Sequence, residues 1–290
     1  MIKIMLLGKN GQVGWELQRT LDPLGEVVAL SRKELDLEEE KAIRDRVREI
    51  KPAIIVNAAA YSAVDQAEVE PEKAWRVNSV APGVLAQEAK RLNALLVHYS
   101  TDYVFDGKKD GPYMEEDKAR PINVYGETKL KGEYNIQEAG AAYLILRTSW
   151  VYGLRGKNFL LTMQCLAKEK DELRVVDDQL GSPTWCRMIA EATALILSQG
   201  KYRVDNYTGI YHLCAGGETS WHGFARAIFD YIFSNEDKYA RLIPIPTSEF
   251  KTLAVRPANS VLSCSKLNAI HGITLPRWNY SLKRALEISE

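Results

Sequence analysis

The sequence predicts an α/β fold in which a doubly wound parallel sheet is joined to a smaller mixed α/β region. Three observations predict this fold. In the first half of the 290 residues, short apolar runs alternate with polar, helix-like segments. The first apolar run ends in a glycine-rich turn, and after Tyr152 the loops become longer and contain proline. Strand–helix alternation of this kind is typical of βαβ units with buried parallel strands.

The expected elements can be assigned in chain order. Apolar runs predict strands at residues 2–7, 26–30, 53–58, 94–100 and 142–148. Helical patterns lie between them near residues 12–22, 38–50, 71–92 and 123–138. The second half predicts helices at about 158–170, 185–199, 220–234 and 280–289, and short strands at 173–176, 210–214 and 242–245. We therefore divide the chain into residues 1–152 and residues 153–290, the second region being interleaved with the sheet.

The composition restricts the class of protein. Lys plus Arg and Asp plus Glu both number 38, so the formal net charge is zero and a basic nucleic-acid surface is not indicated. The four cysteines are far apart, which favours reduced thiols over a disulfide framework or a zinc site. The opening "MIKIMLLG" lacks the pattern of a signal peptide, and no apolar run reaches the roughly 20 residues of a membrane span. We expect a cytoplasmic protein that binds neither nucleic acid nor membrane.

The glycine-rich turn "GKNGQVG" has the spacing of a dinucleotide-binding turn. Gly8 permits a tight turn after the strand, Gly11 permits close approach of a pyrophosphate, and Gly14 lets the helix pack on the strand. The free amides at the helix start bind the anion without basic side chains, which agrees with the neutral net charge. The order strand, turn, helix at the N-terminus favours a Rossmann-type cofactor site over a plain βα turn. The turn also contributes Asn10, Gln12 and Val13.

The next two strands are expected to complete the cofactor site. Ser31 and Arg32 follow the second strand, where an acid would select NAD, so we favour NADPH and keep NADH as the alternative. Arg32 is equally well explained as a solvated loop charge. Asp36 and Leu37 are placed to flank the adenine. The third strand runs into "NAAAYS", whose small residues suit either a flat ligand or close helix packing: Ala58, Ala59, Ala60, Tyr61 and Ser62.

The fourth strand ends in "STDYVFDG", at the edge of the sheet where ligands bind in doubly wound folds. Thr101 can hydrogen-bond a substrate carbonyl there, although Ser, Thr and Asp are also common in ordinary strand-end turns. In "NVYGETKLKGE", Asn123 is a candidate helix cap, and Tyr125 and Lys129 then share one helix face. A tyrosine that exchanges a proton near neutral pH needs its anion stabilised, and a neighbouring ammonium does this.

These segments together resemble the extended short-chain dehydrogenase/reductase superfamily. Within it, "GKNGQVGWEL", "NAAAYSAVDQAE", "HYSTDYVFDG", "VYGETKLKGE" and "LRTSWVYG" resemble the dTDP-4-dehydrorhamnose reductase family, and similarity continues through "DDQLGSPTW" and "RPANSVL". The resemblance implies NADPH-dependent reduction of the C4 ketone of a dTDP-linked 4-keto-6-deoxy sugar. It implies that Tyr125 donates the proton, that Lys129 holds the ribose and lowers the tyrosine pKa, and that Thr101 orients the carbonyl. It also adds Asn78 to the cofactor residues and implies substrate contacts by Val64, Asp102, Tyr103, Trp150, Gln179 and Arg256.

One feature departs from the family pattern. Some members form dimers through glutamates that bind magnesium, and Glu16 matches one such position. The partner position carries Arg187, whose charge would repel a cation. We therefore predict no metal site, and leave a monomer and a homodimer both open.

Four other functions remain as alternatives. Sugar-nucleotide dehydratases of the superfamily place Asp-Glu after the threonine, whereas this chain has Asp102-Tyr103, which favours simple reduction. A sugar-nucleotide 4-epimerase or another reductase of the superfamily is excluded less firmly. A non-catalytic NADP(H)-binding regulatory subunit, of the kind found with methionine adenosyltransferase, is the alternative from a different class.

Overall fold

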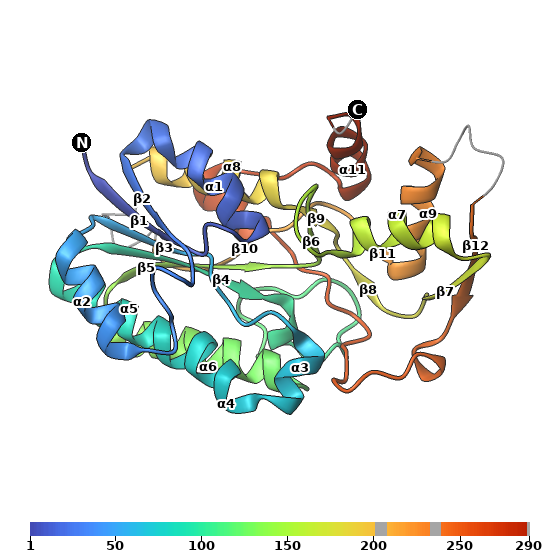
Figure 1. The fold of residues 1–290 in the computed structure, drawn as a ribbon, viewed down its shortest axis with the longest axis horizontal. Coiled ribbons are helices and arrows are strands. Elements are labelled where there is room, and N and C mark those ends of the chain that lie inside the picture. The colour runs from blue at the N-terminus through green and yellow to red at the C-terminus, as the bar shows by residue number, and fades with distance from the viewer. Residues whose placement is uncertain (201–207, 233–238, 289–290) are drawn as a thin grey trace.

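A six-stranded parallel sheet forms the centre of the protein in a computed structural model that describes residues 1–200, 208–232 and 239–288 (Figure 1). Each strand is parallel to its neighbours. In spatial order the strands are β2 (Glu26–Leu30), β1 (Lys3–Leu7), β3 (Ile54–Asn57), β4 (Leu95–Thr101), β5 (Ala142–Thr148) and β10 (Gly209–His212). The strand order reverses between β1 and β3, which confirms the doubly wound fold and places the ligand crevice at that point.

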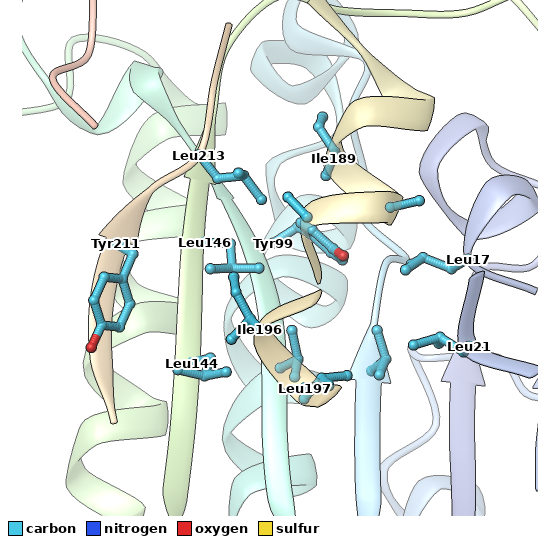
Figure 2. Packing of buried hydrophobic residues seen from close by; sticks show 14 of the residues in the cluster. Leu17, Leu21, Tyr99, Leu144, Leu146, Ile189, Ile196, Leu197, Tyr211 and Leu213 are labelled. Carbon is cyan, nitrogen blue, oxygen red and sulfur yellow. The ribbon is translucent and has the colours of Figure 1, made fainter. Parts of the chain in front are cut away.

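Helices cover both faces of this sheet. On one face lie α1 (Gln12–Leu21) and α8 (Cys186–Ser198), with α10 (Ser265–His271) contributing Leu267 to the same apolar cluster. Figure 2 shows Leu17 and Leu21 of α1 and Ile189 of α8 facing Tyr99 and other side chains of the sheet. On the opposite face lie α2 (Glu40–Ile50), α5 (Ala81–Leu92) and α6 (Val124–Ala139). The apolar faces of these helices hold the sheet as the middle of three layers.

The helix predicted at 71–92 is interrupted in the structure. It consists of α4 (Pro71–Trp75), a π-helical turn η2 (Arg76–Val80) and α5. Pro82 has no N–H to donate to the carbonyl of Asn78, so the regular ladder cannot continue there. The Asn78 carbonyl instead approaches α6, where a Cβ on Gly132 would lie 2.1 Å from it. The interruption thus brings α6 close to the preceding helix.

The second half of the chain builds a smaller region beside the sheet, at the right of Figure 1. Its helices are α7 (Phe159–Glu169), α9 (Trp221–Ile232) and α11 (Trp278–Glu287), around the parallel pair β7 (Glu172–Val176) and β12 (Arg241–Ile245). Residues 233–234 and 289 of the predicted helices lie outside the described residues. The strand expected at 210–214 is β10, which extends the central sheet beside β5.

Several short elements have no counterpart in the sequence prediction. They are α3 (Val64–Val69), α10, the two-residue strands β6 (Val151–Tyr152), β8 (Leu180–Gly181), β9 (Thr184–Trp185) and β11 (Thr219–Ser220), and the 3₁₀ turns η1 (Asp22–Leu24), η3 (Asp102–Val104) and η6 (Thr247–Glu249). Elements of two to seven residues carry too little periodicity for the sequence to reveal them. Within the described ranges, the structure contains no helix long and apolar enough to span a lipid bilayer.

Candidate active site

The glycine-rich turn lies in the crevice between β1 and β3. Gly8 has φ of +83°, and a Cβ there would lie 2.8–2.9 Å from backbone atoms of Ala58 and Ala59, so only glycine fits. A Cβ on Gly14 would lie 2.1 Å from the Gly8 carbonyl oxygen, which confirms the predicted close packing of α1. Gly11 stands at the N-cap of α1, and no side chain among the described residues caps the helix there. Its first amides are thus available to an anion.

A cavity of about 420 Å³ opens from this turn along the carboxyl ends of the strands. The predicted cofactor residues that line it are Gly8, Asn10, Gly11, Gln12, Val13, Ser31, Arg32, Asp36, Leu37, Ala58, Ala59, Ala60, Tyr61, Ser62, Tyr125 and Lys129. Sequence reasoning missed other lining residues: Leu7, Leu30, Leu35, Val77, Tyr99, Ser100, Thr148 and Val151. The apolar ones were indistinguishable from core residues. Ser100 directly precedes the predicted Thr101, and Thr148 ends β5 two residues before the predicted Trp150; these positions are the signal that could have found them.

Asn78 is the one predicted cofactor residue outside the lining of this cavity. It is buried in the η2 turn, where its side chain accepts from the Tyr61 backbone N–H (2.9 Å) and donates to the Tyr61 carbonyl (3.0 Å). It also donates to the Thr128 hydroxyl on α6 (3.1 Å). In this structure Asn78 therefore fixes the loop after β3, and acts on the cavity through Tyr61.

At the far end of the cavity, the residues after β2 form a network of charged groups. The Ser31 hydroxyl and backbone N–H both donate to Glu34 (2.7 and 2.8 Å), and Lys9 pairs with the same carboxylate. These bonds, led by that of Lys9, lower the pKa of Glu34 to about 2. Arg32 is exposed and pairs with Asp36 (3.3 Å) and Glu38 (2.6 Å). Its guanidinium thus lies at the cavity edge, with carboxylates that a bound phosphate would have to replace.

Tyr125 and Lys129 project from α6 at the other end of the cavity. Asn123 caps this helix as predicted, because its side-chain oxygen accepts from the Gly126 N–H at 2.8 Å. The Lys129 side chain is 1% exposed, and its ammonium donates to the Tyr99 carbonyl at 2.5 Å and lies 3.2 Å from His98 Nε2. Burial lowers the pKa of Lys129 to about 8 although Glu133 opposes this.

The hydroxyls around Tyr125 are held by a buried carboxylate. Burial raises the pKa of Tyr125 to about 12, while a hydrogen bond with the Thr101 side chain lowers it. Lys129 is not among the causes of that shift, which differs from the expectation that it lowers the tyrosine pKa. Thr101 donates to Asp102 (3.0 Å), and Ser149 donates to the other oxygen of Asp102 (3.0 Å). Burial raises the pKa of Asp102 to about 6, and Tyr125 is a protonated phenol at neutral pH.

Apart from Tyr125, the predicted substrate residues do not line the cofactor cavity. Tyr103 meets the Tyr125 ring edge to face, with ring centroids 6.0 Å apart. Arg256 pairs with Asp65 at 2.7 Å, on the helix α3 that begins with Val64. Nη1 of Arg256 is buried, and no described residue hydrogen-bonds it.

Trp150, which follows β5, forms an aromatic pair with Trp221 of α9. Trp150 has φ of +45° and stacks on Trp221 with centroids 3.5 Å apart and planes at 3°. The pair rests against Gly181, where a Cβ would lie 2.3 Å from the Trp150 ring. Gln179 is buried nearby in sequence and donates to Thr247 at 3.0 Å. A non-glycine residue at positive φ is costly, and such strain is common at ligand sites.

Arg187, the residue expected to exclude a metal, pairs with Glu16 in the structure. Arg187 Nε lies 3.4 Å from a carboxylate oxygen of Glu16, and Arg19 lies 3.3 Å from the same oxygen. Glu16 is thus neutralised by two arginines. The absence of a metal from this protein stays a prediction.

The residues of the cavity fit a nicotinamide dinucleotide. The glycine turn leaves a space that any Cβ would fill, the first amides of α1 face an anion, and Thr148 Oγ1 is buried without a hydrogen-bond partner among the described residues. With Thr101 at the end of β4 and with Tyr125 and Lys129 on α6, this site defines an NAD(P)-dependent oxidoreductase of the short-chain dehydrogenase/reductase class.

Comparison with known proteins identifies the family within that class. Residues 2–290 match the model of the RmlD substrate binding domain, and the chain belongs to that family. It is 49% identical over 288 residues to the dTDP-4-dehydrorhamnose reductase of Burkholderia thailandensis, covering 97% of both chains. A dTDP-4-dehydrorhamnose reductase structure from Clostridium acetobutylicum superposes with a TM-score of 0.92 at 36% identity, and one from Bacillus anthracis in complex with NADP with a TM-score of 0.89 at 35% identity. Each structure and this chain are covered to 99%.

Proposed function

We propose that the chain reduces the C4 ketone of dTDP-4-dehydro-6-deoxy-L-mannose to give dTDP-L-rhamnose, with NADPH as cofactor. This would be the last step of dTDP-rhamnose biosynthesis. The observation that carries the proposal is the placement of Tyr125, Lys129 and the Thr101 hydroxyl together at one end of a dinucleotide cavity. The family membership supports the same reaction.

The chain's own residues bind, orient and protonate. NADPH, when bound, supplies the hydride to C4. Tyr125 donates its phenolic proton to the C4 oxygen, so the ketone gains one hydride and one proton and becomes an alcohol. The high pKa of Tyr125 keeps that proton in place until the carbonyl is seated beside Thr101. The positive charge of Lys129 then stabilises the phenolate, and its amino group is available to the ribose hydroxyls.

The surrounding side chains suit a sugar nucleotide. We assign the sugar ring to the space between Asp102 and Trp150, and the pyrophosphate to the unpaired Nη1 of Arg256. Gln179, Tyr103 and Val64 complete this side. In this assignment residues 1–152 hold the cofactor and the proton donor, while residues 153–290 mainly bind the sugar nucleotide.

The cofactor preference rests on the residues after β2. Arg32 lines the cavity and provides a charge for a 2′-phosphate, which favours NADPH over NADH. Because its substrate and cofactor are cytoplasmic metabolites, we assign the protein to the cytoplasm. We expect it to act there as a monomer or a homodimer.

The test is coupled turnover of the purified protein. It is supplied with dTDP-4-dehydro-6-deoxyglucose and the epimerase that converts it, with NADPH or NADH, and the product is identified by NMR. We expect NADPH oxidation and dTDP-L-rhamnose. If NADPH is not oxidised and the protein instead binds tightly to a larger enzyme, the protein is a non-catalytic regulatory subunit.

The matched variant is Tyr125→Phe, which removes only the hydroxyl. We expect it to bind NADPH with near-normal affinity and to lose a factor of about 10²–10⁴ in kcat, the range typical of general acid catalysis. Near-normal turnover in this variant would show that another group is the acid.

A further inference from the structure

His98 is a buried residue of β4 that none of the assigned roles includes. Its side chain is 1% exposed and stands behind the cavity, between β3 and α6. Nδ1 lies 3.1 Å from the amide nitrogen of Asn57, and Nε2 lies 3.2 Å from the amino group of Lys129. Burial and the nearby Lys129 lower the pKa of His98 well below its usual range, so the ring is neutral. A neutral imidazole has one donor and one acceptor nitrogen.

The contacts of Asn57 assign which nitrogen carries the proton. The side-chain oxygen of Asn57 accepts from the backbone N–H of Ala59 at 3.2 Å, which fixes the orientation of the amide. The amide nitrogen therefore faces His98 Nδ1 and donates to it. Nδ1 must then be the acceptor, and the single proton of the ring sits on Nε2.

This tautomer directs an N–H at Lys129. An ammonium has three donors and no lone pair, whereas the neutral amine can accept one hydrogen bond and still donate to the Tyr99 carbonyl. His98 Nε2–H thus favours the amine form, in agreement with the lowered pKa of Lys129.

The charged groups around the Lys129 amino group are few. On α6, Tyr125 is a neutral phenol and Glu133 is the one nearby acid. Glu133 is already occupied by Arg147 of β5 at 2.9 and 2.6 Å and by Ser100 of β4 at 2.5 Å. No described carboxylate hydrogen-bonds Lys129, so its position depends on neutral partners.

We propose that His98, fixed in its Nε2–H tautomer by Asn57, is a positioning residue that directs an N–H at the Lys129 amino group and so favours the amine over the ammonium. The role in catalysis rests on the proposed reductase function. A carboxylate at this place would instead stabilise the ammonium. The consequence of the Nε2–H donor is that Lys129 loses its proton at a lower pH than it would beside an acceptor.

The decisive variant is Asn57→Asp, which is nearly isosteric. A carboxylate accepts the proton of Nδ1, so Nε2 becomes an acceptor that faces the ammonium. In wild type, NADPH affinity should fall at high pH as Lys129 loses its proton. We expect the midpoint of that fall to lie at least about one pH unit higher in Asn57→Asp. The control is His212→Gln, which removes another buried histidine from the same sheet and leaves that pH dependence unchanged.

Two measurements test the proposal without using the ketosugar. In the ¹⁵N NMR spectrum of labelled histidine, His98 should show a protonated Nε2 and an unprotonated Nδ1, assigned by its absence from His98→Gln; the chain has four histidines. NADPH fluorescence titrations across pH give the second readout. A protonated Nδ1 on His98 would overturn the proposal. So would a pH midpoint for NADPH affinity that is the same in Asn57→Asp as in wild type. Should His98→Gln fail to fold, the wild-type spectrum and Asn57→Asp still decide. A failure of the proposed reaction shows separately, as missing ketosugar turnover.

Discussion

Replacing Lys129 by methionine is expected to change how the stability of the protein depends on pH. Burial lowers the pKa of Lys129 from 10.5 to about 8, with Glu133 opposing the shift. Between these two values the folded protein binds fewer protons at this site than the unfolded chain does. The free energy of unfolding therefore rises with pH in that window, and the penalty for burying the ammonium is fully present below about pH 8.

The magnitude follows from the shift itself. A difference of about 2.5 pKa units at about 1.4 kcal/mol per unit corresponds to a penalty on the order of 3 kcal/mol at pH 7. Methionine also loses the hydrogen bonds to the Tyr99 carbonyl and His98. That loss is present at every pH, so it cancels when the variant is compared with wild type at two pH values.

The assay is urea unfolding of the cofactor-free protein at about pH 7 and about pH 10.5. Relative to Lys129→Met, wild type should gain on the order of 3 kcal/mol between the two conditions. Lys131→Met, a partly exposed lysine of the same helix, is the control and should track wild type. A constant difference between wild type and Lys129→Met would refute the reasoning, since it would mean that Lys129 keeps an ordinary pKa in the folded state.

Two further substitutions test the two ends of the site. Gly181→Ala places a Cβ 2.3 Å from the Trp150 ring, so the stack on Trp221 must shift; we expect KM for the sugar nucleotide to rise about tenfold and stability to fall by about 1–3 kcal/mol, measured by steady-state kinetics and thermal unfolding. An unchanged KM would remove Trp150 from the sugar site. Arg32→Ser should weaken NADPH binding about tenfold and leave NADH binding nearly unchanged, as judged by fluorescence titration beside Lys33→Ser. An equal effect on both cofactors would argue against a 2′-phosphate contact.

Most of the fold was predictable because its signals are local. The apolar runs that became β1 to β5 and the Asn123 cap of α6 can be recognised from neighbouring residues alone. The place of β10 could not be predicted, because its run of four residues is compatible with any sheet and only the pairing with β5 decides. The π-helical break at η2 depends on Pro82 and on the close approach of Gly132 in the distant helix α6. The apolar periodicity alone therefore predicts one continuous helix.

The candidate site likewise contains residues that local sequence signals predict and residues that only the folded structure brings together. Glycine and strand-end motifs located most of the cavity, since their chemistry is tied to a turn or an edge. Asn78 was assigned to the cofactor by resemblance to the family, whereas in the structure its side chain holds Tyr61. His98 lies inside an apolar strand, and nothing in the sequence pairs it with Asn57 or Lys129. Those contacts join three elements and exist only in the folded protein.

The pairing of β10 with β5 and of α8 with α1 also sets an order for the synthesis of the chain. Gly209 and its neighbours extend the cofactor sheet, and α8 covers apolar side chains of α1 that are made about 170 residues earlier. When only the first 152 residues have left the ribosome, the chain exposes the unpaired edge of β5 and the uncovered apolar face of α1. Both favour aggregation. Folding of the N-terminal half should therefore wait for the C-terminal half, and a truncation after Tyr152 should be insoluble although it contains every predicted cofactor residue.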